Sequence, residues 1–132
     1  MGLSGARAYT NVKATSGVED ADPHMLIQML VDGAIEKINM AKYFMQKREW
    51  AKKGQHISWA ISIIGGLRAS LDMEKGGEIS ANLENLYEFS TATLIEANSN
   101  NDLDKLESVL KVMKLIKEGW DGIREEGLAT AS

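Results

Sequence analysis

Apolar residues recur at steps of three and four along most of this chain, which is the period of a helix with one buried face. The repeat occupies four stretches, residues 23–48, 50–73, 78–98 and 102–123. In the first stretch the core stripe consists of Leu26, Ile27, Leu30, Ala34, Ile38, Ala41 and Met45. Four amphipathic helices joined by short turns pack as a bundle, so the pattern predicts an all-α fold, an antiparallel up-down-up-down four-helix bundle.

Capping residues and glycines mark the ends of these helices. Asp22 is a good N-cap residue, and Pro23 suits the first position of a helix. Gly76 and Gly77 can adopt the left-handed conformation that closes a helix, while Glu78 places a negative charge where the next helix presents its unpaired amide groups. These signals predict a tight antiparallel helical hairpin around the two glycines.

The two ends of the chain lack this periodicity. Residues 1–22 mix Gly, Ser, Thr and Ala with one aromatic residue, Tyr9, and are predicted to form a flexible N-terminal arm with one docked turn at most. Residues 23–124 form the predicted bundle, and residues 125–132 are predicted to be a disordered tail. A chain of 132 residues fits this single-domain organisation.

Composition narrows the class of protein. Hydrophobic residues make up 44% and charged residues 26%, which is usual for a soluble folded protein. The absence of cysteine excludes disulfides and thiolate chemistry and suits a reducing compartment. A net charge of -4 opposes a broad nucleic-acid surface, and no window reaches the roughly 18 to 20 apolar residues that span a bilayer. We therefore expect a cytoplasmic protein that neither binds nucleic acid nor inserts into a membrane.

The two histidines are the first candidates for chemistry. A di-iron bundle needs Glu three residues before each His, but Ala21 precedes His24 and Lys53 precedes His56 at that spacing. A His phosphotransfer bundle would be expected to continue with Lys and Gly, whereas Ile57 follows His56. We expect both histidines to be ordinary surface residues. The prediction is a protein that is not an enzyme, with no catalytic residue, metal ligand or cofactor.

The first helix carries apolar residues beyond its core stripe. At 100° per residue, Met25, Met29, Met40 and Tyr43 fall on one strip well away from the centre of that stripe. Methionine side chains adapt easily to an incoming apolar helix, so the strip indicates a partner-binding groove. The alternative is a wide apolar arc that simply packs against two neighbouring helices.

Other helices extend this set. Trp59, Ile63 and Leu115 also fall outside their core stripes, and several such residues on one small domain suggest a surface for another protein. The helix over 78–98 shows the reverse, because Ser90 and Thr93 occupy core turns. They predict either a thin region, where a partner segment or a neighbouring helix approaches closely, or side chains bonded to their own helix. The predicted partner-binding residues are Tyr9, Met25, Met29, Met40, Tyr43, Trp59, Ile63 and Leu115.

Three blocks of sequence, in order along the chain, carry a family resemblance. They run from Ala8-Tyr9 through Ala21-Asp22-Pro23-His24-Met25 to Ile35, from Ser70-Leu71-Asp72-Met73-Glu74-Lys75-Gly76-Gly77-Glu78-Ile79 to Tyr87, and from Leu94-Ile95-Glu96-Ala97-Asn98 to Trp120. In these blocks the chain resembles the flagellar secretion chaperones of the FliS family, which bind flagellin in the cytoplasm before export.

The resemblance implies a chaperone that wraps the disordered C-terminal segment of flagellin around its outside. Such a protein keeps flagellin from polymerising prematurely and hands it to the export gate of the flagellar type III secretion apparatus, without a cofactor. The family's N-terminal arm can cover part of the client groove, which would make Tyr9 a displaceable plug. The alternatives are a helical-bundle adaptor for another secretion client and a phosphotransfer module on His56. Formation of a homodimer is left open.

Overall fold

The computed structural model describes the backbone of residues 22–131 and the side chains of residues 22–123. The elements are four helices, α2 (Pro23–Gln46), α3 (Trp50–Ala69), α4 (Met73–Asn100) and α5 (Leu103–Ala131). No strand occurs within residues 22–131. The all-α prediction is therefore confirmed. The predicted arm, with Tyr9, lies outside the described residues.

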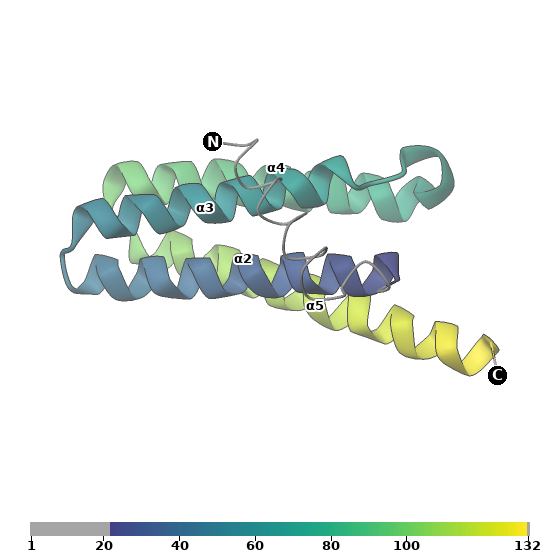
Figure 1. Cartoon of the computed structure of the whole chain (residues 1–132). Coiled ribbons are helices and arrows are strands. Elements are labelled where there is room, and N and C mark those ends of the chain that lie inside the picture. The colour runs from purple at the N-terminus through teal and green to yellow at the C-terminus, as the bar shows by residue number, and fades with distance from the viewer. Residues whose placement is uncertain (1–21, 132) are drawn as a thin grey trace.

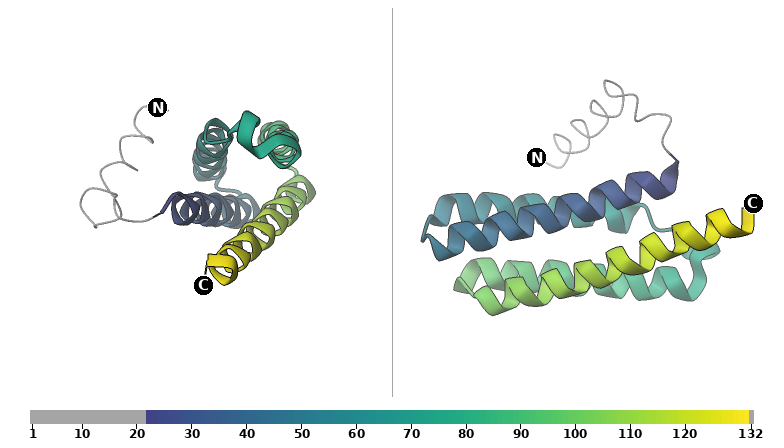
Figure 2. Two further views of the ribbon diagram at one scale, coloured as in Figure 1. Left: turned by 90° about the vertical axis from the view of Figure 1, so that its right-hand side faces the viewer. Right: turned by 90° about the horizontal axis from the view of Figure 1, so that it is seen from below.

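The helices form an antiparallel bundle (Figure 1). α2 packs against α3 and α5, and α4 packs against the same two helices, while no Cα atoms of the two diagonal pairs approach within 8 Å in the described chain. The end-on view in Figure 2 shows the four helices at the corners of the bundle. The far end of α5 projects beyond the rest, at the end of the bundle that holds the connection between α3 and α4.

Short capping bonds set the beginnings of the helices. The backbone N–H of Met25 donates to Asp22 Oδ1 at 2.8 Å, with Pro23 in the first turn, as the sequence predicts. The N–H of Lys105 donates to Asp102 Oδ1 at 3.3 Å at the start of α5. Each bond satisfies an amide that has no partner inside its helix.

The core runs along the axis of the bundle and draws on all four helices. Its fully buried large side chains include Ile38, Ile57, Ile64, Leu67, Leu94, Leu106, Val109 and Met113. Each such side chain contributes roughly 1.5–3 kcal/mol through burial. This well-filled interior leaves the outer faces of the helices as the place to look for function.

The connection between α3 and α4 differs from the prediction. α3 ends at Ala69, where the hydroxyl of Ser70 donates to the Leu67 carbonyl at 2.6 Å. Asp72 then caps a single turn by accepting from the N–H of Lys75 at 2.9 Å, and Gly77, with φ of 50°, separates that turn from the rest of α4. The side-chain caps therefore end α3 before the glycines, and Gly77 supplies a kink.

The rotation of α4 also differs from the prediction. Ile79 and Leu86 belong to the apolar repeat over residues 78–98, which predicts them in the core, but they are 60% and 38% exposed. Ser80 is buried instead, because its hydroxyl donates to the Asp72 carbonyl at 2.9 Å and fixes the first turn after the kink. Ser90 and Thr93 face the interior, so α4 carries small polar side chains on its buried face.

α5 is longer than the hydrophobic pattern predicts. Its helix continues to Ala131, whereas residues 125–132 were expected to be a disordered tail. Four of residues 125–129 are strong helix formers, Gly127 is the exception, and no proline interrupts the stretch. Helix propensity therefore extends α5 after its apolar repeat has ended.

Candidate partner-binding surfaces

Four aromatic rings form a continuous row on the outside of α2 and α3. The ring centroids of Tyr43 and Phe44 are 5.3 Å apart, those of Phe44 and His56 are 5.0 Å apart, and those of His56 and Trp59 are 6.2 Å apart. Tyr43 is 54% exposed and Trp59 is 52% exposed. We call these four residues the aromatic seam.

The antiparallel pairing of α2 and α3 creates this row. Phe44 lies before the connection between α2 and α3 and contacts His56, which lies after it. Further from this connection, Lys37 of α2 contacts Trp59 of α3. Further still, a Cβ atom at Gly33 would lie 3.6 Å from Ile63 Cδ1. Ile63 is partly buried against the core, so it closes the floor of the seam.

Lysine side chains flank the aromatic seam. Lys37 Nζ lies 3.8 Å from the ring centroid of Trp59, and Lys52 Nζ lies 5.5 Å from that of Phe44. Lys47 Nζ lies 5.7 Å from the ring centroid of Tyr43. At exposed sites such cation–π contacts contribute about 0.5–1 kcal/mol each. The seam therefore combines an aromatic floor with a cationic rim.

A second candidate surface lies at the opposite end of the bundle. A pocket of about 370 Å³ opens between the first turns of α2, the connection from α3 to α4, and α5. Its apolar lining includes Ile27, Leu71, Ile79, Leu83, Tyr87 and Trp120. Burial raises the pKa of Tyr87 from its ordinary value of 10.0 to about 12, so its hydroxyl stays uncharged. We call this the end pocket.

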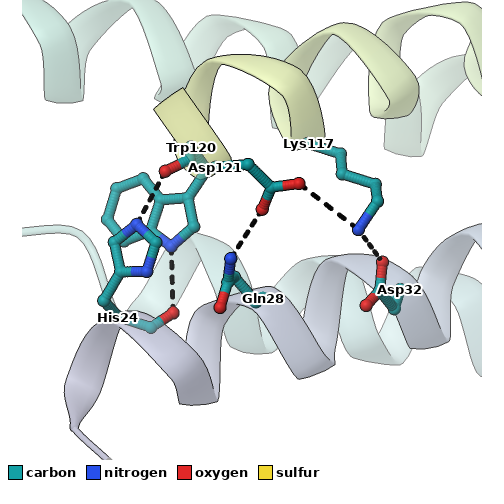
Figure 3. A network of polar contacts seen from close by, with 6 residues as sticks. All are labelled: His24, Gln28, Asp32, Lys117, Trp120 and Asp121. Carbon is teal, nitrogen blue, oxygen red and sulfur yellow. Dashed lines mark hydrogen bonds and ion pairs between the residues drawn. The ribbon is translucent and has the colours of Figure 1, made fainter. Parts of the chain in front are cut away.

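Trp120, which lines the end pocket, is hydrogen-bonded to His24 of α2 (Figure 3). The indole N–H of Trp120 donates to the His24 carbonyl at 3.0 Å, and His24 Nε2 lies 2.6 Å from the Trp120 carbonyl. Their rings stack with centroids 4.6 Å apart and planes 7° apart. Because a carbonyl oxygen only accepts, His24 Nε2 carries the proton. The prediction that His24 is an ordinary surface residue is therefore wrong: it joins α2 to α5.

A row of polar contacts continues this junction along α2 and α5. Gln28 Nε2 donates to Asp121 Oδ1 at 2.6 Å, and Lys117 Nζ donates to Asp32 Oδ1 at 2.7 Å (Figure 3). The hydrogen bond to Asp32 raises the pKa of Lys117. These contacts are structural, and they fix α5 against α2 beside the end pocket.

The predicted partner-binding residues are distributed unevenly. Tyr43 and Trp59 belong to the aromatic seam, Ile63 continues its floor, and Met40 lies one turn before Phe44 on the same side of α2. Met25 and Met29 are exposed nearer the start of α2, while Met40 is partly buried.

Two predicted residues lie apart from that group. Leu115 is 67% exposed, but it lies on the outward face of α5, opposite the core positions of that helix. Tyr9 lies outside the described residues. The structure thus brings together Met40, Tyr43, Trp59 and Ile63, and it leaves Met25, Met29 and Leu115 apart from them.

Several exposed apolar residues were missed by the sequence reasoning. Phe44 completes the aromatic seam, and its position opposite His56 follows from counting back across the turn. Ile79, Leu86 and Phe89 are exposed along α4. The hydrogen bond from Ser80 and the kink at Gly77 turn Ile79 and Leu86 outward. These two residues are the sequence signal for the exposure of Ile79 and Leu86.

The described residues offer few candidates for metal binding, histidine chemistry or membrane insertion. Within the described residues, no group of three or more His, Asp or Glu side chains is placed to hold a metal ion. His56 uses Nδ1 to contact the Lys52 carbonyl at 2.7 Å. None of the helices in residues 22–131 combines the length and apolar character needed to cross a bilayer.

Comparison with known proteins identifies the family. The sequence model described as "Flagellar protein FliS" matches residues 5–127. This chain belongs to the FliS family. The flagellar secretion chaperone FliSB of Pseudomonas aeruginosa is 43% identical over 121 residues, covering 92% of this chain and 96% of that protein. The resemblance to FliS chaperones in the sequence blocks is confirmed.

Other FliS proteins match over a similar length. The flagellar secretion chaperone FliS of Salmonella typhimurium is 43% identical over 121 residues, covering 91% of this chain and 90% of that protein. FliS of Bacillus subtilis is 27% identical over 112 residues, covering 85% of this chain and 82% of that protein. The FliS likeness therefore extends over nearly the whole chain.

Proposed function

We propose that this flagellar secretion chaperone binds the disordered C-terminal segment of flagellin on its outer surface in the cytoplasm. It thereby prevents premature polymerisation and delivers flagellin to the flagellar type III export gate. The observation that carries the proposal is the aromatic seam. A bundle whose interior is already filled exposes half of Tyr43 and half of Trp59 at the junction of two helices.

The physical mechanism is the docking of helices into grooves. A disordered segment forms short amphipathic helices whose apolar faces cover the seam and the methionines of α2. Each apolar side chain that leaves water contributes roughly 1.5–3 kcal/mol, while ordering the segment costs about 2–5 kcal/mol. Several side chains must therefore bind together, which fits a client that wraps around the bundle. The same apolar faces are then hidden from other flagellin molecules.

The end pocket supplies an anchor for a single large apolar side chain. Its lining is largely apolar, and the Tyr87 hydroxyl adds no charge at physiological pH. Met25 and Met29 are exposed on the first turns of α2, the helix that also contributes Ile27 to the pocket. A client segment anchored here can continue along α2 toward the aromatic seam.

We also propose a role for Tyr9 in the N-terminal arm. The arm leads into α2 at Asp22, and the first turns of α2 form part of the end pocket. In this proposal the arm covers the client groove and flagellin displaces it. Deleting residues 1–20 should then raise the affinity for flagellin and leave the bundle folded. Unchanged affinity together with an unfolded bundle would show that Tyr9 belongs to the core.

A polymerisation assay tests the chaperone activity. Flagellin is induced to polymerise, and light scattering is followed with increasing amounts of this protein. We expect stoichiometric suppression. Met29→Glu should weaken suppression while helicity is kept, and Ser108→Glu adds the same charge at an exposed position of α5 as a control. Equal loss of suppression and of helicity in Met29→Glu would make Met29 a core residue.

Delivery to the export gate needs its own test. Purified gate domain is immobilised, and binding of this protein is measured with and without the flagellin C-terminal segment. The proposal predicts that the loaded complex is retained. If neither form is retained, while flagellin is still bound, the protein protects its client without carrying it to the gate.

A further inference from the structure

The segment around the turn between α2 and α3 is unusually basic. Residues 37–53 contain six basic residues and one acidic residue, although the whole chain has a net charge of -4. Two of the six are engaged elsewhere: Lys42 pairs with Glu107 of α5, and Lys53 donates to the Asn98 carbonyl at 2.9 Å. The other four are Lys47, Arg48, Lys52 and Lys37, whose Nζ lies 3.6 Å from Glu36 Oε1.

We propose that the aromatic seam and these four cations dock an acidic amphipathic helix of a protein partner. This goes beyond the proposed flagellin contact, because it specifies a charged partner segment for one end of the bundle. The apolar face of that helix covers Tyr43 and Trp59. Its Glu or Asp side chains, one turn apart, reach the lysines on the rim.

Charge complementarity is the first support for this occupant. Within the described residues no carboxylate pairs with Lys47 or Arg48, so both remain available to an incoming anion. Lys52 has only Glu49, at 3.6 Å, and both side chains are about half exposed. Such a surface pair exchanges readily for a better placed carboxylate.

The backbone at Arg48 is the second support. Arg48 has φ of 59°, in the left-handed region where glycine is favoured. This position closes α2, and glycine would close it with less strain. A strained residue is a reason to look for a use of its side chain. We infer that the Arg48 side chain places a cation at the end of the aromatic seam.

The shape of the surface favours a helix over a bilayer or nucleic acid. The rings of Phe44 and His56 pack against each other and against their neighbours, so only Tyr43 and Trp59 of the four rings are exposed enough to reach a bilayer. Glu36 and Glu49 lie within the cationic rim and repel an extended anionic surface.

Designed peptides test the proposal directly. The probe is an amphipathic helix with Leu on one face and Glu on its flanks, and the control probe has Gln in place of each Glu. Binding to the full chain is measured by calorimetry. The Glu peptide should bind at least about tenfold more tightly than the Gln peptide, as expected for two surface ion pairs. Its advantage should shrink in about 1 M salt, where the screening length falls to about 3 Å.

Matched variants locate the site. Lys47→Gln with Lys52→Gln should lower affinity for the Glu peptide about tenfold. Lys111→Gln with Lys114→Gln removes the same charge from exposed positions of α5 and should change nothing. Arg48→Gly should lower affinity while the protein remains at least as stable, which separates binding from folding.

Four results would overturn the inference. Equal affinity for the Glu and Gln peptides, or equal losses in the two double variants, would show that the cationic rim does not select its partner. Binding to vesicles of phosphatidylglycerol without binding to the Glu peptide would make the surface a lipid contact. The flagellin C-terminal peptide is measured on the same proteins: if it binds and the Glu peptide does not, this inference fails and the proposed function stands.

Discussion

Trp120 and His24 each contact the other's main-chain carbonyl, although they are 96 residues apart in sequence. The Trp120 indole N–H donates to the His24 carbonyl at 3.0 Å, and His24 Nε2 returns the contact to the Trp120 carbonyl at 2.6 Å. This pair ties the start of α2 to α5 and fixes Trp120, which lines the end pocket. Trp120 therefore stabilises the fold, whereas Trp59 is half exposed on the aromatic seam.

The two tryptophans should therefore respond differently to truncation. Trp120→Ala removes a hydrogen bond and a stacked ring, and should lower the free energy of unfolding by about 2–3 kcal/mol, below the usual range for a fully buried ring. Trp59→Ala loses one exposed ring and its contact with Lys37, so the loss should be about 0.5–1 kcal/mol. Urea unfolding followed by circular dichroism measures both.

Client binding should show the opposite order. Trp59→Ala should weaken binding of the flagellin segment, because it removes an exposed ring from the aromatic seam. Trp120→Ala, measured where it is still folded, should affect binding only through the end pocket. If both variants lose stability equally, the distinction between a structural and a binding tryptophan is wrong.

Arg48 offers a prediction in the stabilising direction. Arg48→Gly should raise the free energy of unfolding by about 0.5–1 kcal/mol, because relief of left-handed strain exceeds the extra freedom of glycine in the unfolded chain. Asn101→Gly, also at a positive φ of 50°, is the control. Asparagine tolerates this conformation, so the gain there should be smaller. A lower denaturation midpoint for Arg48→Gly would contradict the assigned strain.

Lys53 should be a stabilising residue despite its charge. It is 5% exposed and donates from Nζ to the carbonyl and side-chain oxygens of Asn98, at 2.9 and 2.8 Å. Lys53→Met leaves these acceptors at the end of α4 without their donor, so stability should fall by about 2 kcal/mol. Lys52→Met, next to it but exposed, should change stability by less than about 0.5 kcal/mol. Equal effects would refute the assignment.

Tyr87 predicts how stability depends on alkaline pH. Its pKa is raised by burial from 10.0 to about 12, so folding favours the neutral hydroxyl. The stabilisation is complete below pH 10 and is lost as the pH rises toward 12. Tyr87→Phe cannot ionise and should lose less stability over this interval. Thermal unfolding of both proteins across the interval provides the measurement, and parallel curves would show that Tyr87 does not contribute.

The helices and their caps could be predicted from sequence because their causes are local. The three- and four-residue repeat and the cap at Asp22 act within a few residues. The rotation of α4 could not be predicted from its apolar residues, since Ile79 and Leu86 look like core positions. A hydrogen bond from Ser80 to Asp72 and the kink at Gly77 decide that rotation instead.

The candidate surfaces were predictable only in part for a similar reason. Tyr43 and Trp59 stand out because each lies off the core stripe of its own helix. Tyr43 and Trp59 belong to one seam because Phe44 of α2 contacts His56 of α3, which is a tertiary contact. The end pocket likewise depends on His24 and Trp120, which the sequence separates widely.

The most direct test of the account is calorimetry with a peptide from the C-terminus of the cognate flagellin. We predict saturable binding at micromolar concentrations, with a negative heat-capacity change from apolar burial, and a clear loss of affinity in Trp59→Ala while its helical signal is unchanged. No binding at micromolar concentrations by a folded protein would contradict the central claim, and so would equal affinity of the wild type and Trp59→Ala.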